Sequence, residues 1–147
     1  TLRNSSAASD VYKRQYIRRP SVYVVLPRVN KLLVTVQRVP QEEIQLPGGG
    51  VEIGEQYLQA LYREVTEETG WIISNPKKLG TYRRFTYMAE YSLWAEKICH
   101  IFLAKPVIKK SEPTEPGHFA FFMSAKDVIK NLIGEGDKSF VQSCFRL

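Results

Sequence analysis

The sequence predicts an α/β fold in which a mixed β-sheet lies between layers of helices. The chain has 147 residues, which is close to the size of one ordinary domain. Runs of β-branched and aromatic residues alternate with segments of helical periodicity, a pattern typical of strands and helices packed in layers. Residues 93–104 are apolar on both faces, as expected for a central strand that is covered on both sides.

Composition and charge exclude several classes of protein. Hydrophobic residues make up 44% of the chain and charged residues 24%, which excludes a disordered or fibrous protein. No apolar run approaches the roughly 18 residues that cross a bilayer, so no membrane partner is expected. Five basic residues and one acidic residue fall within residues 1–20, a net +4 of the total +6. Because the basic charge is concentrated there, nucleic acid is not the expected partner.

The ends and the cysteines set the expected domain limits and location. Residues 1–15 are rich in Ser and Ala without apolar periodicity, which predicts a disordered tail or sequence that is not native to the protein. Residues 16–147 form the predicted domain. Cys99 and Cys144 lie far apart and are predicted to be separate buried thiols, which favours a reducing, cytoplasmic location.

The first predicted elements are strands. Residues 21–26 and 31–39 are β-branched and apolar, and the Pro-Arg-Val-Asn segment at residues 27–30 between them predicts a hairpin turn. Gln45 and Leu46 add a short strand, which Pro47 and the three glycines after it are expected to end.

A helix over residues 55–69 is the clearest element in the sequence. Its apolar positions Leu58, Leu61, Tyr62 and Val65 have the spacing i, i+3, i+4 and i+7, and Gly70 is placed to end it. Further strands are predicted at residues 79–87, 93–104 and 119–123. Ser124 is expected to cap a second helix, with four apolar residues facing inward, that ends at Gly134, and Asp137 to cap a third. The inward residues predicted for these two helices are Val128, Ile129, Leu132, Ile133, Phe140, Val141, Cys144 and Phe145.

Three carboxylates on the main helix point to metal chemistry. Glu64, Glu67 and Glu68 lie at i, i+3 and i+4, so all three are predicted to project from one turn. They repel one another and lie at the helix C-terminus, where the helix dipole disfavours anions. A divalent cation would relieve both effects, and oxygen ligands favour Mg²⁺ or Mn²⁺. The alternative, a solvated acidic face, is weakened by the preceding glycines, which allow a close backbone approach to the same cation.

The segment from Gly49 to Trp71 resembles the Nudix box, G-x5-E-x7-R-E-U-x-E-E-x-G-U, where U is a bulky aliphatic residue. It reads GGVEIGEQYLQALYREVTEETGW, and only Trp71, in the last U position, departs from the pattern. The matching positions are Gly49, Glu55, Arg63, Glu64, Val65, Glu67, Glu68 and Gly70. The resemblance implies the Nudix α/β/α sandwich and Mg²⁺-dependent hydrolysis of a phosphoanhydride bond in a nucleoside diphosphate compound, with Mn²⁺ as a possible substitute.

The resemblance also implies a role for each site residue. Glu64 and Glu68 resemble the principal metal ligands, with the backbone carbonyl of Gly48 as a ligand from the loop. Glu67 is implied as a further ligand or as the residue that activates water. The resemblance implies that Arg63 is catalytic together with the three glutamates. It also implies that Arg63 and Glu55 form the pair that braces the loop against the helix.

Residues outside the box leave alternatives open. Glu96 is interpreted as a fourth carboxylate ligand or as an exposed or Lys-paired residue. His100 and His118 are predicted to be structural, because neither has a His or Cys partner at metal-ligand spacing. An aromatic and basic group is interpreted either as a base- and phosphate-binding surface or as ordinary strand packing. It comprises Tyr82, Arg83, Arg84, Phe85 and Tyr87.

The substrate is predicted by elimination within the family. The additional motifs of ADP-ribose, NADH and coenzyme A hydrolases have no counterpart here, which favours a MutT-like pyrophosphohydrolase of (deoxy)nucleoside triphosphates. Dinucleoside polyphosphates, nucleotide sugars and capped RNA are the alternative substrates. A non-catalytic nucleotide-sensing module is a further alternative, and the sequence leaves the oligomeric state open.

Overall fold

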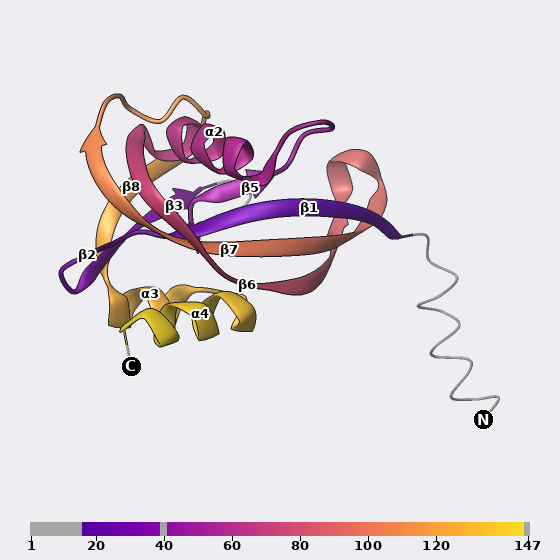
Figure 1. Cartoon of the computed structure of the whole chain (residues 1–147). Helices are drawn as coiled ribbons and strands as arrows, with labels where there is room; N and C mark the ends of the chain where they lie inside the picture. Colours follow the sequence, from indigo (N-terminus) through magenta and orange to yellow (C-terminus); the bar gives the residue numbers. More distant parts are fainter. Residues whose placement is uncertain (1–15, 39–40, 146–147) are drawn as a thin grey trace.

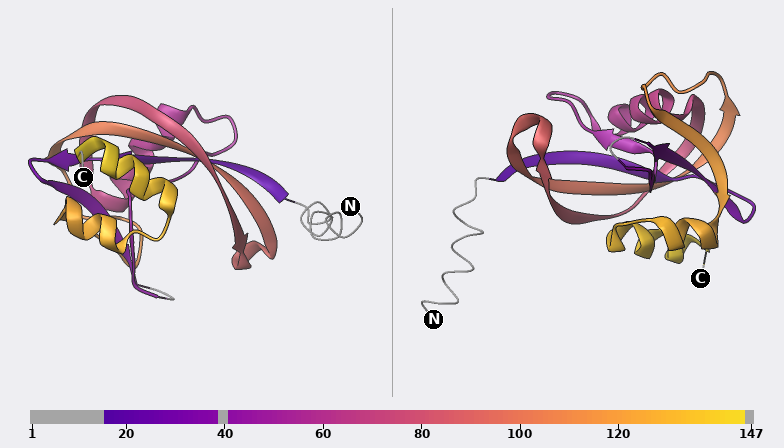
Figure 2. Two further views of the ribbon diagram at one scale, coloured as in Figure 1. Left: turned by 90° about the horizontal axis from the view of Figure 1, so that it is seen from below. Right: turned by 180° about the vertical axis from the view of Figure 1, so that it is seen from behind.

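The computed structural model describes residues 16–38 and 41–145 (Figure 1). The tail expected at residues 1–15 lies outside the described residues. In chain order the elements are five strands, one long helix, two long strands joined through a single 3-10 turn, a last strand and two helices. The α/β class predicted from the sequence is confirmed, since strands and helices lie in layers (Figures 1 and 2).

The first sheet is mixed and contains the two longest strands. Its order is β5 (Gly48–Gly50), β1 (Tyr16–Val25), β7 (Leu93–Lys109) and β6 (Trp71–Met88). β1 runs parallel to β7, while β5 and β6 pair antiparallel with β1 and β7 respectively. A 3-10 turn, η1 (Ala89–Tyr91), separates β6 from β7. β6 and β7 both extend beyond the lengths predicted from apolar patterning.

The second sheet is built around β3 (Lys31–Gln37). This strand pairs antiparallel with β2 (Pro27–Arg28), β4 (Glu43–Gln45) and β8 (His118–Ser124). The predicted hairpin between residues 21–26 and 31–39 is therefore wrong in extent. Both edges of β1 are occupied by β5 and β7, so β3 has no edge of β1 to join, and only β2 forms the hairpin ladder with it.

Helices cover both faces of the strands. α2 (Tyr57–Thr69) lies on one side, and α3 (Ala125–Asn131) and α4 (Glu135–Phe145) lie on the other (Figures 1 and 2). Each side has its own buried cluster. β7 supplies Phe102 and Ala104 to the cluster under α2, and Cys99 and Ile101 to the cluster under α3 and α4. This alternation confirms that β7 is a central strand covered on both faces.

α2 differs from its prediction in its start and in its buried face. It begins at Tyr57, and Gly70 ends it in the left-handed conformation, as expected from its lack of a Cβ. Leu61 and Val65 are buried, but Leu58 and Tyr62 are 45% and 41% exposed. The inward face is rotated towards Glu68 and Thr69, which are both buried. One side of the polar C-terminal turn of the helix is thus packed inside the protein.

The glycine segment forms a strand instead of ending one. Gly48 to Gly50 pair with residues 21–23 of β1 as β5. A Cβ atom on Gly48 would lie 2.0 Å from the Val22 carbonyl oxygen, so only glycine allows β5 to approach β1 this closely. This strand carries backbone groups to the edge of α2.

The C-terminal helices follow the prediction in part. Ser124 caps α3 by accepting a hydrogen bond from the Asp127 backbone N–H at 3.2 Å, as expected. The helix ends at Asn131, before Gly134, and Ile133 is 67% exposed, so these two details were wrong. Asp137 lies inside the first turn of α4 and does not cap it, because its carboxylate is turned inward to Tyr82.

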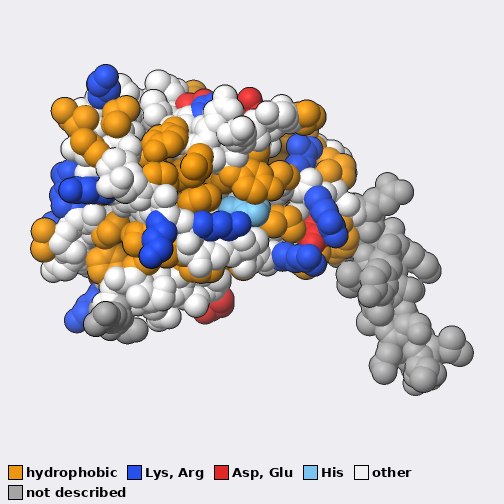
Figure 3. All heavy atoms as spheres, in the orientation of Figure 1, with side chains coloured by type: hydrophobic (Ala, Val, Ile, Leu, Met, Phe, Trp, Pro, Cys, Tyr) orange, Lys and Arg blue, Asp and Glu red, His pale blue; other side chains and the backbone are white. Residues whose placement is uncertain are grey.

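The surface agrees with the balanced composition. On the face shown in Figure 3, hydrophobic side chains gather in a central band, and Lys and Arg are dispersed around it in separate groups. Among the described residues, no helix has the length and apolar character needed to cross a membrane.

Candidate active site

A cavity of about 480 Å³ opens beside β5 and the C-terminal half of α2. Its walls combine glycine backbone, carboxylate side chains and two basic side chains. The residues that carry these groups are Gly48, Gly49, Gly50, Glu64, Glu68, Glu90, Glu115, Asp137, Arg84 and Lys97. We call this cavity the cleft. The glycine segment and the acidic helix thus lie side by side at the cleft, as predicted from the sequence.

Two glutamates of α2 lie against the backbone of β5. The Gly48 N–H donates to Glu68 Oε1 at 2.9 Å. A Cβ atom on Gly49 would lie 2.5 Å from the Glu64 carboxylate, so a side chain there would displace Glu64. The glycines therefore allow two carboxylates to pack directly on a strand edge at the cleft.

Burial makes these two carboxylates hard to ionise. The Glu68 side chain is 7% exposed, and burial raises its pKa to about 8 despite the hydrogen bond from Gly48, with neighbouring carboxylates adding to the effect. Burial likewise raises the pKa of Glu64, although Arg63 opposes the change. Two buried carboxylates with raised pKa values are a donor set that fits a hard divalent cation such as Mg²⁺ or Mn²⁺.

Arg63 joins the loop after β5 to α2. Its Nε and Nη2 donate to the two Glu55 carboxylate oxygens at 2.8 Å each, and Nη2 also donates to the Gly50 carbonyl at 3.0 Å. Its Nη1 donates to Glu64 Oε1 at 2.9 Å. Hydrogen bonds from Arg63 hold the pKa of Glu55 down at about 2, so this carboxylate stays ionised. These contacts join the loop to the helix as expected for a brace, and the catalytic role of Arg63 stays a prediction.

Glu67 is placed differently from the other two box glutamates. Its side chain is 43% exposed, contacts Arg63 Nη1 at 3.4 Å and does not line the cleft. The prediction that all three carboxylates project together was therefore too simple. The Glu67 backbone carbonyl instead accepts hydrogen bonds from the N–H groups of Thr114 and Glu115, at 2.8 and 3.3 Å, which ties the loop before β8 to the helix.

Two basic side chains from β6 and β7 also line the cleft, together with the acidic Glu90 and Asp137. Lys97 of β7 and Arg84 of β6 are paired across the two strands and line the cleft. Neither forms a salt bridge with any residue that the structure describes. Burial, followed by the charge of Arg84, lowers the pKa of Lys97. Lys97 was not predicted as a site residue, although a lysine inside a strand covered on both faces was an available signal.

The predicted aromatic and basic group is divided between two faces of β6. Arg84 faces the cleft, and Tyr82 donates from its hydroxyl to Asp137 Oδ1 at 2.6 Å. Arg83, Phe85 and Tyr87 alternate with these residues and lie on the other face. There, Phe85 stacks edge-to-face on Tyr16 and Tyr87 packs on Trp94. The structure thus favours strand packing for that half of the group.

Glu96 is not a further ligand of the cleft. It lies on the opposite face of β7 from Lys97, is nearly buried, and contacts Arg18 at 3.5 Å and Arg83 at 3.4 Å. Both interpretations of Glu96 therefore need correction, because its partners are two arginines and its side chain is not exposed. Carboxylates from outside the box that do line the cleft are those of Glu90, Glu115 and Asp137, none of which was predicted as a site residue.

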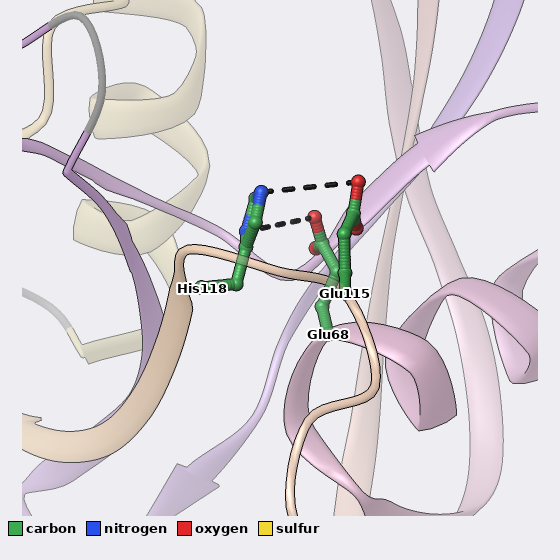
Figure 4. Close-up of side chains that lie close together, drawn as sticks. All are labelled: Glu68, Glu115 and His118. Atoms are coloured by element: carbon green, nitrogen blue, oxygen red, sulfur yellow. Dashed lines mark ion pairs between the residues drawn. The ribbon is translucent and has the colours of Figure 1, made fainter.

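The two histidines have different surroundings. His100 packs its ring on Tyr57, with centroids 4.3 Å apart, and its Nδ1 is 3.4 Å from Thr81 Oγ1, in agreement with the structural role predicted for it. His118 lines the cleft between Glu68 and Glu115 (Figure 4). The structural role predicted for His118 did not anticipate this position between two carboxylates of the cleft, and that role stays a prediction.

Comparison with known proteins identifies the family. A family model described as the NUDIX domain matches residues 17–144. The chain belongs to the Nudix hydrolase family. Solved structures with the same fold include a NUDIX hydrolase from Nitrosomonas europaea, with 21% identity, a TM-score of 0.68, and coverage of 88% of this chain and 87% of that chain. Another is a mutator MutT protein from Bacillus halodurans, with 21% identity, a TM-score of 0.69, and coverage of 84% and 80%.

A curated relative is matched over a shorter segment. An RNA pyrophosphohydrolase of Thioalkalivibrio sulfidiphilus is 40% identical over 52 residues. This segment covers 35% of the present chain and 30% of the relative. The similarity is thus confined to under a third of that protein. A match of this length does not show that the two proteins share a substrate.

Proposed function

We propose that this Nudix hydrolase is an Mg²⁺-dependent pyrophosphohydrolase of (deoxy)nucleoside triphosphates, releasing a nucleoside monophosphate and pyrophosphate. The observation that carries the proposal is the lining of the cleft, which brings Glu64 and Glu68 of α2 together with Lys97 of β7 and Arg84 of β6. A phosphate chain bound between a carboxylate-held cation and two side-chain cations is neutralised from both sides.

Each part of the cleft has a proposed task. Glu64 and Glu68 hold the cation, with the Gly48 carbonyl as the expected loop ligand. A bound divalent cation neutralises charge on the phosphates and lowers the pKa of the attacking water. Arg84 and Lys97 bind phosphate oxygens and orient the chain for in-line attack, which needs positioning more than covalent chemistry. Glu67 is retained as the predicted further ligand or base, because its contact with Arg63 at 3.4 Å is long.

One alternative substrate has an observation of its own. A second hollow of about 470 Å³ shares Glu64, Lys97 and Tyr91 with the cleft and continues towards Arg19. The Arg19 guanidinium lies 5.8 Å from the centre of the Tyr91 ring. An arginine beside an exposed aromatic ring suits a nucleotide that follows the first, as at the 5′ end of a triphosphorylated RNA. The curated relative named above is an RNA pyrophosphohydrolase, which adds to this alternative.

The test compares each basic residue of the cleft with a matched control on the same strand that lies outside the cleft. Arg84→Gln should raise KM for nucleoside triphosphates about 10-fold, since a charge-assisted contact contributes roughly 1.5 kcal/mol. Arg83→Gln changes the neighbouring residue on the opposite face and should leave KM nearly unchanged. Lys97→Met is compared with Lys105→Met, an exposed lysine of β7 that does not line the cleft. Equal effects within each pair would refute the proposed phosphate contacts.

Substrate preference is tested on the unmodified protein. Under the main proposal, kcat/KM for a nucleoside triphosphate exceeds that for a short 5′-triphosphorylated RNA. The opposite order would favour the RNA alternative, and binding without turnover of any substrate would favour a nucleotide-sensing module. Dinucleoside polyphosphates and nucleotide sugars belong in the same panel. A cytoplasmic location is part of the proposal and is supported by the unpaired thiols of Cys99 and Cys144.

A further inference from the structure

His118 faces Glu68 at a separation longer than a hydrogen bond. His118 is the first residue of β8, and its Nδ1 lies 3.7 Å from Glu68 Oε2 (Figure 4). Both side chains are more than nine-tenths buried, at 9% and 7% exposed. The separation is longer than a hydrogen bond of about 3 Å, and Nδ1 has no hydrogen-bond partner among the described residues. A buried polar nitrogen without a partner is rare and needs a physical reason.

The chemistry of the two facing atoms suits a cation between them. Glu68 Oε1 already accepts the Gly48 N–H, so Oε2 is the oxygen turned to His118. Two ligands bound at about 2.1 Å to one cation lie roughly 3.0 Å apart in octahedral geometry and roughly 3.4 Å apart in tetrahedral geometry. The observed 3.7 Å needs only a few tenths of an ångström of closure.

Glu115 lies at the other ring nitrogen. Its Oε1 is 3.8 Å from His118 Nε2, so the imidazole stands between two carboxylates (Figure 4). With a cation at Glu68, the imidazole proton would stand on Nε2, towards Glu115, and the Nδ1 lone pair would be directed at the cation. Histidines that bind metals commonly have such a carboxylate on the second nitrogen.

The backbone holds this arrangement in place. The loop that carries Glu115 is tied to α2 through the Glu67 carbonyl, and the N–H groups of Lys110 and Ser111 donate to the Gly70 carbonyl at 2.8 and 3.2 Å. The His118 N–H donates to the Glu115 carbonyl at 3.4 Å. The position of His118 relative to Glu68 is thus fixed by contacts with the end of the helix.

We propose that His118 supplies a nitrogen ligand, through Nδ1, to the cation that Glu68 holds, with Glu115 as a positioning residue for the imidazole. The inference rests on the proposed function only in placing a cation at Glu68. A mixed nitrogen and oxygen site favours first-row transition ions such as Mn²⁺, because Mg²⁺ strongly prefers oxygen ligands. This chain should therefore bind Mn²⁺ more tightly than Mg²⁺, and either ion can serve the proposed hydrolysis.

Pulsed electron paramagnetic resonance of the Mn²⁺-loaded, tag-free protein tests the proposal directly. The chain contains only two histidines, so imidazole ¹⁴N coupling to Mn²⁺ has two possible sources. The unmodified protein should show this coupling, His118→Gln should lose it, and His100→Gln should keep it. His118→Gln should also weaken Mn²⁺ binding ~10-fold or more while changing Mg²⁺ binding far less. Glu115→Gln should keep the ¹⁴N coupling with weaker Mn²⁺ binding.

The outcomes separate this inference from the proposed function. Absence of ¹⁴N coupling in the Mn²⁺-loaded unmodified protein overturns the inference, whether or not any variant folds, and so does coupling that survives in His118→Gln. If nucleoside triphosphates are still hydrolysed in that case, the proposed function stands. Coupling in a protein that hydrolyses none of the nucleotides supports the inference and contradicts the function.

Discussion

Replacing Glu68 by Gln removes the charge at the centre of the cleft while preserving the shape of the side chain. Gln retains an oxygen to accept the Gly48 N–H, so the contact with β5 can persist. A hard cation loses its carboxylate ligand, so turnover should fall at least ~10²-fold, about 2.7 kcal/mol of lost transition-state stabilisation. Gln59→Ala, on the exposed side of α2, is the control and should leave turnover unchanged.

The same substitution should stabilise the metal-free protein, and the effect should depend on pH. Burial raises the Glu68 pKa from 4.5 to about 8. Each pKa unit corresponds to about 1.4 kcal/mol, so ionised Glu68 costs the fold at most about 5 kcal/mol. This cost is absent below pH 4.5, grows as the pH rises and is complete above pH 8. In EDTA, Glu68→Gln should therefore match the unmodified protein at pH 5 and be more stable at pH 9.

Urea unfolding at pH 5, 7 and 9, in EDTA, measures the effect for both proteins and for Gln59→Ala. The reasoning would be refuted by stability curves that run parallel from pH 5 to pH 9. It would equally be refuted by a Glu68→Gln variant that is less stable than the unmodified protein at pH 9 yet fully active.

Three further predictions follow from other contacts. Millimolar Mg²⁺ or Mn²⁺ should raise the melting temperature, because a cation that binds only the folded state stabilises it; no shift would contradict a site in the cleft. Arg63→Lys loses the two-nitrogen contact with Glu55 and should lower kcat ~10- to 100-fold in steady-state assays, and an unchanged kcat would show that the brace is dispensable. Tyr82→Phe leaves the buried Asp137 carboxylate without its donor and should cost about 1–3 kcal/mol in urea unfolding, whereas Tyr87→Phe, at a half-exposed position, should cost little. Equal losses in these two variants would speak against the buried pair.

The sequence sufficed for features that depend on local patterning. Helical periodicity predicted the position of α2. Gly70 marked its end, because the residue that ends a helix often adopts the left-handed conformation, which glycine adopts most readily. The apolar character of residues 93–104 indicated a strand covered on both faces. The fixed spacing of the box brought Glu64 and Glu68 to one wall, since residues four apart share a helix face.

Features that depend on contacts distant in sequence were missed or misjudged. β3 was predicted to pair with β1, because two strands joined by a short turn usually pair. In the structure, β5 and β7 already occupy both edges of β1. Glu115 and Lys97 reach the cleft from a loop and from β7, so no spacing within the box points to them. His118 was judged structural for want of a nearby His or Cys, whereas its carboxylate neighbours come from α2 and from the loop before β8.

The most direct test of the proposed chemistry is ³¹P nuclear magnetic resonance of the products formed from a panel of nucleoside triphosphates with Mg²⁺ or Mn²⁺. Hydrolysis at a cation held by Glu64 and Glu68 should yield nucleoside monophosphate and pyrophosphate. The products should disappear in EDTA and fall at least ~10²-fold with Glu68→Gln. Release of pyrophosphate that continues at the same rate in EDTA, or that is unaffected by Glu68→Gln, would contradict a metal-dependent mechanism centred on these carboxylates.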